Sequence, residues 1–198
     1  MAQLPDLIAP GLKVLFCGIN PGACAAERGH HFLGRGNRFW RVLHLAGFTP
    51  ALIDARDDRY ILDHGCGITA AVSRPTTRAS ELDRQEFELG KAELVGKLER
   101  YRPAFIAFLG KPAFEAMFNV RAAPWGLQAE SVGATAIWIV PNPSGLNRGF
   151  SLDDLVRDYA ALRRVAFGES GATAPGRSGR GAHRAGGPAA NRTCGPRP

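Results

Sequence analysis

Two short loops carry the residues of this sequence that are best suited to chemistry. One is residues 18–22, which read Gly-Ile-Asn-Pro-Gly, and the other is residues 142–148, which read Asn-Pro-Ser-Gly-Leu-Asn-Arg. Each loop places an Asn before Pro, and the flat amide of Asn offers both hydrogen-bond donors and an acceptor. Such a side chain can hold a water molecule or bond the amide-like edge of a base. Proline stiffens each loop, and glycine lets the backbone approach a ligand closely.

Each loop follows a short apolar run, residues 12–17 and residues 136–140. Apolar runs of this length, bounded by Gly and Pro, are typical of buried strands in an α/β sheet. Ligands of such sheets bind outside the carboxyl ends of the strands. We therefore expect the two loops to meet at one site, although they are far apart in the sequence.

Strands and helices are predicted to alternate along the domain. Residues 105–109 form a further expected strand, residues 111–118 a short helix, and residues 152–165 a final amphipathic helix. The last helix has apolar residues at helical spacing, namely Leu152, Leu155, Val156, Tyr159 and Leu162. This alternation predicts a single three-layer α/β/α domain with a central, mostly parallel sheet.

Two more helices are expected from their amino-terminal signals. Asn37 is suited to cap a helix over residues 38–45, whose inward positions would be Phe39, Trp40, Leu43 and Leu45. Ser80, followed by Asp83, resembles a capping box and would begin a long charged helix that reaches Tyr101.

Taken together, the two loops resemble those of the mismatch-specific uracil-DNA and thymine-DNA glycosylases. The resemblance runs from about residue 12 to about residue 167 and includes residues 29–32, 36–40 and 74–76. The two loops in this order and at this separation are a specific signal, whereas either loop alone would be weak. The resemblance implies the uracil-DNA glycosylase fold and a hydrolase that cleaves N-glycosidic bonds in double-stranded DNA. Its expected substrate is uracil in a G·U mismatch. Thymine in a G·T mismatch and other modified pyrimidines are alternative substrates. The abasic product would enter base excision repair.

The resemblance also implies a role for each loop residue. Asn20 corresponds to the Asn that positions the attacking water at C1′, and Asn142 is the second expected catalytic residue. Other uracil-DNA glycosylases place a His at the start of the second loop, so anion stabilisation is expected to be weaker here. The flipped base is expected to contact five residues, with Ile19 and Phe32 as its two walls: Ile19, Gly22, Ala25, His31 and Phe32. The expected wedge, which fills the gap left by the flipped nucleotide and contacts the opposite strand, is Ser144, Gly145, Leu146 and Arg148.

Ala25 bears on base choice. The uracil-selective bacterial branch of the family tends to carry a hydroxyl residue near this position, and Ala leaves more room beside the C5 atom of the base. By this feature the sequence is closer to the thymine-processing branch.

Alternatives remain for these assignments. Asn20 can be an ordinary turn residue, Leu146 can pack on its own domain, and Arg148 can bind a phosphate without any base contact. The rival function is a mismatch or damaged-DNA binder without catalysis. A nucleotide-binding α/β domain is less well supported, because no Lys-Ser/Thr closes the first loop and no G-x-G-x-x-G follows it.

Charge and composition divide the chain into a domain and a tail. The 198 residues carry a formal net charge of +7, and residues 169–198 hold five Arg and one Glu. We expect residues 1–168 to form the glycosylase domain, with only a modest positive charge. Residues 169–198 are rich in Gly, Ala, Pro and Arg and are expected to be disordered, either as a plain extension or as a cationic DNA tether.

No cofactor or metal is expected. Neither loop contains a Lys, so we expect a monofunctional glycosylase without a Schiff-base lyase step. The four cysteines form no C-x-x-C pair, which argues against zinc; an iron–sulfur cluster is conceivable, but free thiols fit better. The sequence shows no signal peptide and no apolar run near the ~18 residues of a membrane span. We expect a cytoplasmic monomer whose partner is double-stranded DNA and not a membrane.

Overall fold

A five-stranded sheet forms the centre of the computed structural model, which describes residues 4–34 and 36–168. Its strands are β1 (Val14–Gly18), β2 (Cys66–Ala70), β3 (Phe105–Leu109), β4 (Gly126–Val132) and β5 (Thr135–Val140). Their order across the sheet is β2-β1-β3-β5-β4. All neighbours pair in parallel except β4, which runs antiparallel to β5. The predicted α/β class with a mostly parallel sheet is therefore confirmed.

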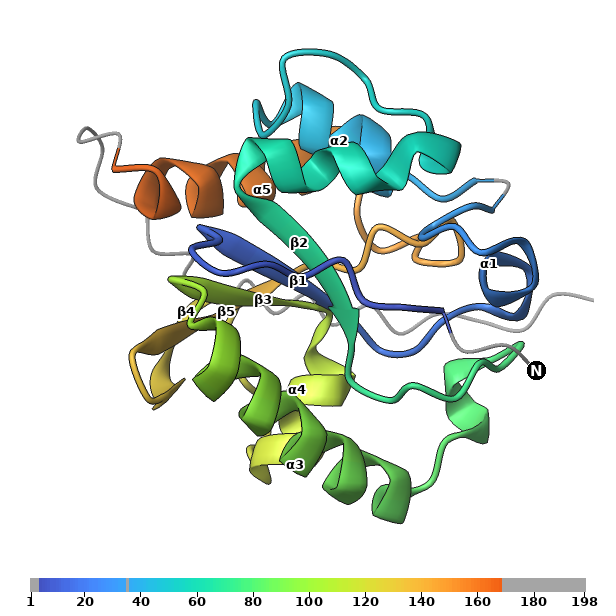
Figure 1. Ribbon diagram of the computed structural model, residues 1–198. Coiled ribbons are helices and arrows are strands. Elements are labelled where there is room, and N and C mark those ends of the chain that lie inside the picture. Colours follow the sequence, from blue (N-terminus) through green and yellow to red (C-terminus); the bar gives the residue numbers. More distant parts are fainter. Residues whose placement is uncertain (1–3, 35, 169–198) are drawn as a thin grey trace, which may run out of the picture.

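Helices cover both faces of the sheet (Figure 1). On one face lie α2 (Phe39–Leu45) and α5 (Leu152–Ala166), and on the other lie α3 (Arg84–Tyr101) and α4 (Lys111–Phe118). The short helix α1 (Ala23–Arg28) follows β1, and two 3₁₀ segments span Ala55–His64 and Ala79–Glu81. The expected three-layer arrangement is thus present.

The strand β1 shows how one short segment supports both layers. Val14 and Phe16 belong to the core beneath α2 and α5, whereas Leu15 and Cys17 belong to the core beneath α3 and α4. All four are fully buried, as expected for a central parallel strand whose side chains alternate between two covered faces. The ring of Phe16 packs edge-on against Phe39, with 5.4 Å between the ring centroids.

Most elements lie where the sequence predicts them. The strand Phe105–Leu109 and the helix Lys111–Phe118 have the expected bounds, and the last helix extends one residue beyond the expected end. Its inward stripe is confirmed, because Leu155, Tyr159 and Leu162 are fully buried. The predicted strand over 12–17 is observed slightly later in the chain, as β1.

Two helix details were predicted wrongly. Leu45 is 48 % exposed, and the inward position of α2 is taken by Val42, which is fully buried. Ser80 lies in a 3₁₀ turn and caps nothing; Asp83 itself is the N-cap of α3, and its side chain accepts a hydrogen bond from the backbone N–H of Glu86. The capping box therefore begins three residues later than expected, because Glu86, not Asp83, is the acid that closes it.

The sheet order creates a switch point beside β1. The chain leaves β1 to form β2 on one side and later returns to form β3 on the other side. Connections that depart in opposite directions leave a crevice at the carboxyl ends of the two strands, where open α/β sheets bind their ligands. No helix in residues 4–34 and 36–168 is long and apolar enough to cross a bilayer.

Candidate active site at the carboxyl edge of the sheet

A cavity of about 540 Å³ opens at this switch point. Its walls include residues at or just beyond the carboxyl ends of four parallel strands, namely Gly18, Ala70, Leu109 and Asn142. The two predicted loops therefore meet at one site. Nine of the expected site residues line the cavity: Ile19, Asn20, Gly22, Ala25, His31, Phe32, Asn142, Ser144 and Leu146. Gly145 and Arg148 are not among its lining residues.

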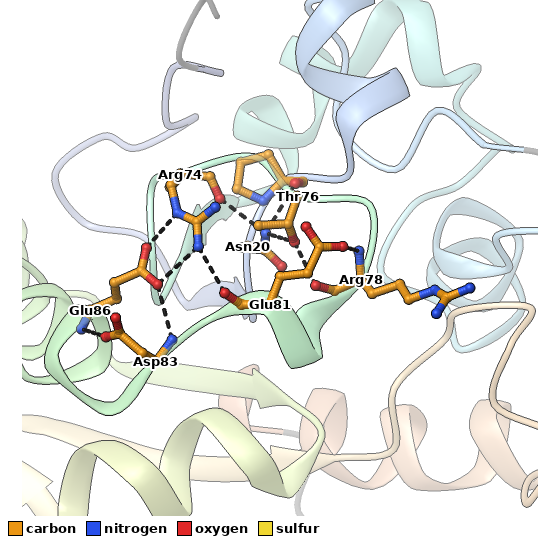
Figure 2. Close-up of polar contacts among 8 residues, drawn as sticks. Asn20, Arg74, Thr76, Arg78, Glu81, Asp83 and Glu86 are labelled. Carbon is orange, nitrogen blue, oxygen red and sulfur yellow. Dashed lines mark hydrogen bonds and ion pairs between the residues drawn. The ribbon is translucent and has the colours of Figure 1, made fainter.

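The side chain of Asn20 is fixed by the segment that follows β2 (Figure 2). Its Nδ2 donates to the carbonyl oxygen of Arg74 at 3.0 Å and to Oγ1 of Thr76 at 2.7 Å. A carbonyl can only accept, and the Thr76 hydroxyl gives its own proton to the carbonyl of Arg78. The amide orientation of Asn20 is therefore determined by its neighbours. Asn20 lines the cavity, and its Oδ1 accepts no hydrogen bond from the described residues, so this acceptor stays available.

The segment that holds Asn20 is itself anchored at two places. Its backbone pairs with the first loop, because Thr76 N–H donates to Pro21 O and Ala23 N–H donates to Thr76 O. The guanidinium of Arg74 forms an ion pair with Glu86 at the start of α3 and donates to the carbonyl of Glu81. The hydrogen bond from Arg74 is the chief cause that lowers the pKa of Glu86 to about 2, and the backbone N–H of Asp83 adds to it. A charged pair thus secures the carbonyl that orients Asn20 (Figure 2).

Asn142 is oriented by its own loop. Its Oδ1 accepts a hydrogen bond from the backbone N–H of Ser144 at 2.9 Å, which closes an Asx turn. Its carbonyl oxygen accepts a hydrogen bond from Nδ2 of Asn147 at 2.8 Å. Because the N–H of Ser144 can only donate, Nδ2 of Asn142 is the end that stays without a partner among the described residues. Asn142 also lines the cavity, so the two asparagines there leave opposite ends of their amides without a partner: the acceptor of Asn20 and the donor of Asn142.

The predicted aromatic wall, Phe32, has a strained backbone. Its φ of 56° lies in the left-handed region, which a bulky residue adopts only when the surroundings enforce it. The ring stacks on Phe39 with 3.9 Å between centroids. It also lies close to Gly18, where an added Cβ would be 3.9 Å from Cζ of Phe32. This conformation places a flat apolar ring in the cavity wall, with Ile19 also lining the cavity.

His31 is a buried member of the same wall. Its Nε2 is 2.9 Å from the carbonyl oxygen of Pro5, and its backbone N–H donates to Asp58. Burial lowers the pKa of His31, which favours the neutral ring at neutral pH. In the neutral form the bond to a carbonyl requires the proton on Nε2. The backbone carbonyl of His31 accepts a further bond from the indole N–H of Trp40.

The second loop exposes one large apolar side chain. Leu146 is 89 % exposed, so it does not pack on its own domain, and that alternative is excluded. Gly145 passes so close to Gly36 that an added Cβ would lie 2.5 Å from the Gly36 carbonyl oxygen. This approach requires glycine and fixes the loop against residues 36–38. Arg148 is exposed and makes no hydrogen bond or ion pair with any described residue.

Arg38 holds the second loop in place, and the sequence analysis missed it. Its guanidinium donates to the backbone carbonyls of Ser144 at 3.1 Å, Asn147 at 2.9 Å and Phe150 at 2.8 Å. Its backbone N–H also donates to the carbonyl of Pro143 at 3.0 Å. One side chain thus holds the loop that presents Leu146. The only available sequence signal was the position of Arg38 in the segment 36–40, which resembles the glycosylase family.

The predicted division at residue 168 stays a prediction, because the tail over 169–198 lies outside the described residues. The three described cysteines, Cys17, Cys24 and Cys66, are free thiols.

Comparisons with known proteins agree with this architecture. The chain resembles a candidate uracil DNA glycosylase from Methanosarcina acetivorans, whose solution NMR structure superposes with a TM-score of 0.59 at 20 % sequence identity. The match covers 83 % of this chain and 97 % of that chain, and at this identity it concerns the fold. The family model of the uracil DNA glycosylase superfamily matches residues 5–163, most of the chain. The protein therefore belongs to the uracil DNA glycosylase superfamily.

Proposed function

We propose that this protein is a monofunctional DNA glycosylase that removes uracil from G·U mismatches in double-stranded DNA. Membership of the superfamily supports the reaction class. The observation that carries the finer proposal is the pair of asparagines, which leave opposite ends of their amides available at one cavity.

Hydrolysis of an N-glycosidic bond needs two kinds of stabilisation. As the bond breaks, its electron pair stays on the base, and the sugar develops cationic character at C1′. A water molecule must be held near C1′, and the negative charge on the base needs hydrogen-bond donors aimed at it. In the proposal, Oδ1 of Asn20 accepts a hydrogen bond from the attacking water, whose oxygen bonds to C1′ and whose proton passes to solvent. Nδ2 of Asn142 donates to a base oxygen, so the departing anion is stabilised without a charged group.

The flipped base is held between Ile19 and Phe32. Stacking on an aromatic ring contributes about 1–3 kcal/mol, and the fixed ring of Phe32 loses little freedom on binding. Flipping costs a few kcal/mol, least for a mismatched base. Leu146 offsets part of this cost by filling the vacated space, as intercalating apolar side chains do in other DNA-binding proteins. Preference for uracil opposite guanine is assigned to the loop that carries Leu146 and Arg148.

Turnover tests the proposal directly. The protein is incubated with duplexes that carry one G·U, A·U or G·T pair, and abasic sites are cleaved with alkali. We expect release of uracil from the G·U duplex in the presence of a chelator. Asn20→Ala should reduce the single-turnover rate by about 10²-fold or more while DNA affinity stays near wild type.

Two results would contradict the proposal. Binding of the G·U duplex without any release would favour the mismatch binder, and a near-normal rate for Asn20→Ala would remove Asn20 from the chemistry.

A further inference from the structure

One wall of the cavity comes from the segment that precedes β1. Leu4 packs with Ala25 and Ala26 in a small apolar cluster that is separate from the two main cores. Leu4 and Ala25 both line the cavity, and they are 9 % and 8 % exposed. The amino-terminal segment therefore lies beside α1 (Figure 1). Through Leu4 it forms part of the cavity wall.

Three successive residues fasten this segment to the domain. The carbonyl oxygen of Pro5 accepts the hydrogen bond from Nε2 of His31 at 2.9 Å. The carboxylate of Asp6 accepts a hydrogen bond from the Thr69 hydroxyl at 2.9 Å and pairs with Lys97 at 2.6 Å. These contacts of Pro5 and Asp6, together with those of Leu7, leave Leu4 little freedom to move away from Ala25.

The backbone of Leu7 adds a further anchor. Its N–H and carbonyl exchange hydrogen bonds with Ile68 of β2 at 2.9 and 2.8 Å, so the segment continues the edge of the sheet in an antiparallel bridge. The close approach also explains Gly67, since an added Cβ there would lie 2.5 Å from the carbonyl oxygen of Leu7. The sheet itself thus fixes Leu7, three residues after Leu4.

Leu4 has the largest side chain in the cluster that it forms with Ala25 and Ala26. Ala25 and Ala26 each present one methyl group, so the space beside them is limited by the side chain packed against them. In an apolar site, one methylene group is worth about 10–200-fold in specificity, which is a measurable effect. We propose that Leu4 is a specificity-determining residue, which together with Ala25 limits the size of the pyrimidine that the pocket accepts.

This inference rests on the proposed function and is tested by ratios of rates. Single-turnover release is measured for uracil, thymine and ethenocytosine, each opposite guanine, with wild type, Leu4→Ala and Leu4→Phe. Leu4→Ala should raise the rate of thymine or ethenocytosine release, relative to the rate of uracil release, by about tenfold. Leu4→Phe should lower the same ratio. The substrate whose ratio changes identifies the edge of the base that faces Leu4.

Ile8→Ala is the matched control, since Ile8 belongs to the same segment but packs against the core beneath α3 and α4. It should leave the substrate ratios unchanged. If neither Leu4 variant alters either ratio while uracil is still released, the inference is wrong and the proposed function stands. The same change of ratio in Ile8→Ala would assign the effect to loosening of the segment and overturn the role of Leu4. If wild type releases no base at all, the proposed function fails and the inference fails with it.

Discussion

Asn20 and Asn142 leave opposite ends of the same functional group available at one cavity. The Nδ2 of Asn20 is bonded to Arg74 and Thr76, whereas the Oδ1 of Asn142 is bonded to the N–H of Ser144. Neither amide can be exchanged end for end, because the Arg74 carbonyl cannot donate and the Ser144 N–H cannot accept. Two chemically identical side chains are thereby fixed as an acceptor and a donor.

The donor end of Asn142 can be removed without breaking its turn. Asn142→Asp keeps an oxygen for the Ser144 N–H but replaces Nδ2 with negative charge beside the departing anion. We expect the single-turnover rate of uracil release to fall by about 10²–10³-fold, as when an oxyanion donor is lost. The melting temperature should stay near that of wild type. A rate close to wild type would show that Nδ2 does not face the base.

The wedge can be tested separately from stability. Leu146 is 89 % exposed, so Leu146→Ala should leave the melting temperature unchanged. We expect it to reduce flipping, measured with a fluorescent base analogue beside the mismatch, and to slow uracil release.

Arg148→Ala should lower the ratio of the uracil-release rate from G·U duplexes to that from A·U duplexes. If the two variants keep the wild-type ratio of G·U to A·U rates, the loop does not contact the opposite strand productively.

The sequence predicts the central strands and the place of the site because these depend on local patterns. The apolar runs before residues 18–22 and 142–148 are bounded by Gly and Pro, and parallel strands bring their carboxyl ends to one edge. Two strands escaped prediction. β2 contains Gly67, which its contact with Leu7 requires, and β4 is a partly exposed edge strand with a mixed pattern. In neither strand does the local sequence show an uninterrupted apolar run.

Arg38 could not be predicted for a different reason. Its partners are backbone carbonyls more than 100 positions away in the sequence, and carbonyls are present at every residue. No pattern of residue types can indicate which carbonyls a guanidinium will find. The orientation of the two asparagine amides is likewise a property of the fold, because it depends on neighbours such as Arg74 that lie on other elements.

Arg38 should act through the loop that it holds. Arg38→Lys keeps the charge but cannot reach all three carbonyls with a planar fork. Losing part of this network should cost about 2 kcal/mol and lower the melting temperature by about 5 °C. Uracil release should slow together with flipping. Arg41→Lys, at an exposed position of α2, the helix that Arg38 precedes, is the matched control and should change neither quantity.

The ion pair behind Asn20 should give a pH-dependent contribution to stability. Arg74 holds the pKa of Glu86 at about 2, below its ordinary value of 4.5, so folding favours the ionised carboxylate. This contribution is fully present above the unfolded pKa and is lost as the pH falls through about 2. Glu86→Gln removes the charge but keeps an oxygen for the N–H of Asp83.

At pH 7 and low salt, we therefore expect Glu86→Gln to melt below wild type, and the gap should close as the pH approaches 2. Thermal melts at pH 7, 5, 4, 3 and 2 measure this gap. Glu88→Gln is the matched control, because the pair of Glu88 with Arg84 lies on the same helix but is far more exposed. It should lower the melting temperature less at pH 7. A gap for Glu86→Gln that stays constant from pH 7 to pH 2 would mean that the Arg74–Glu86 charge pair does not stabilise the segment holding Asn20.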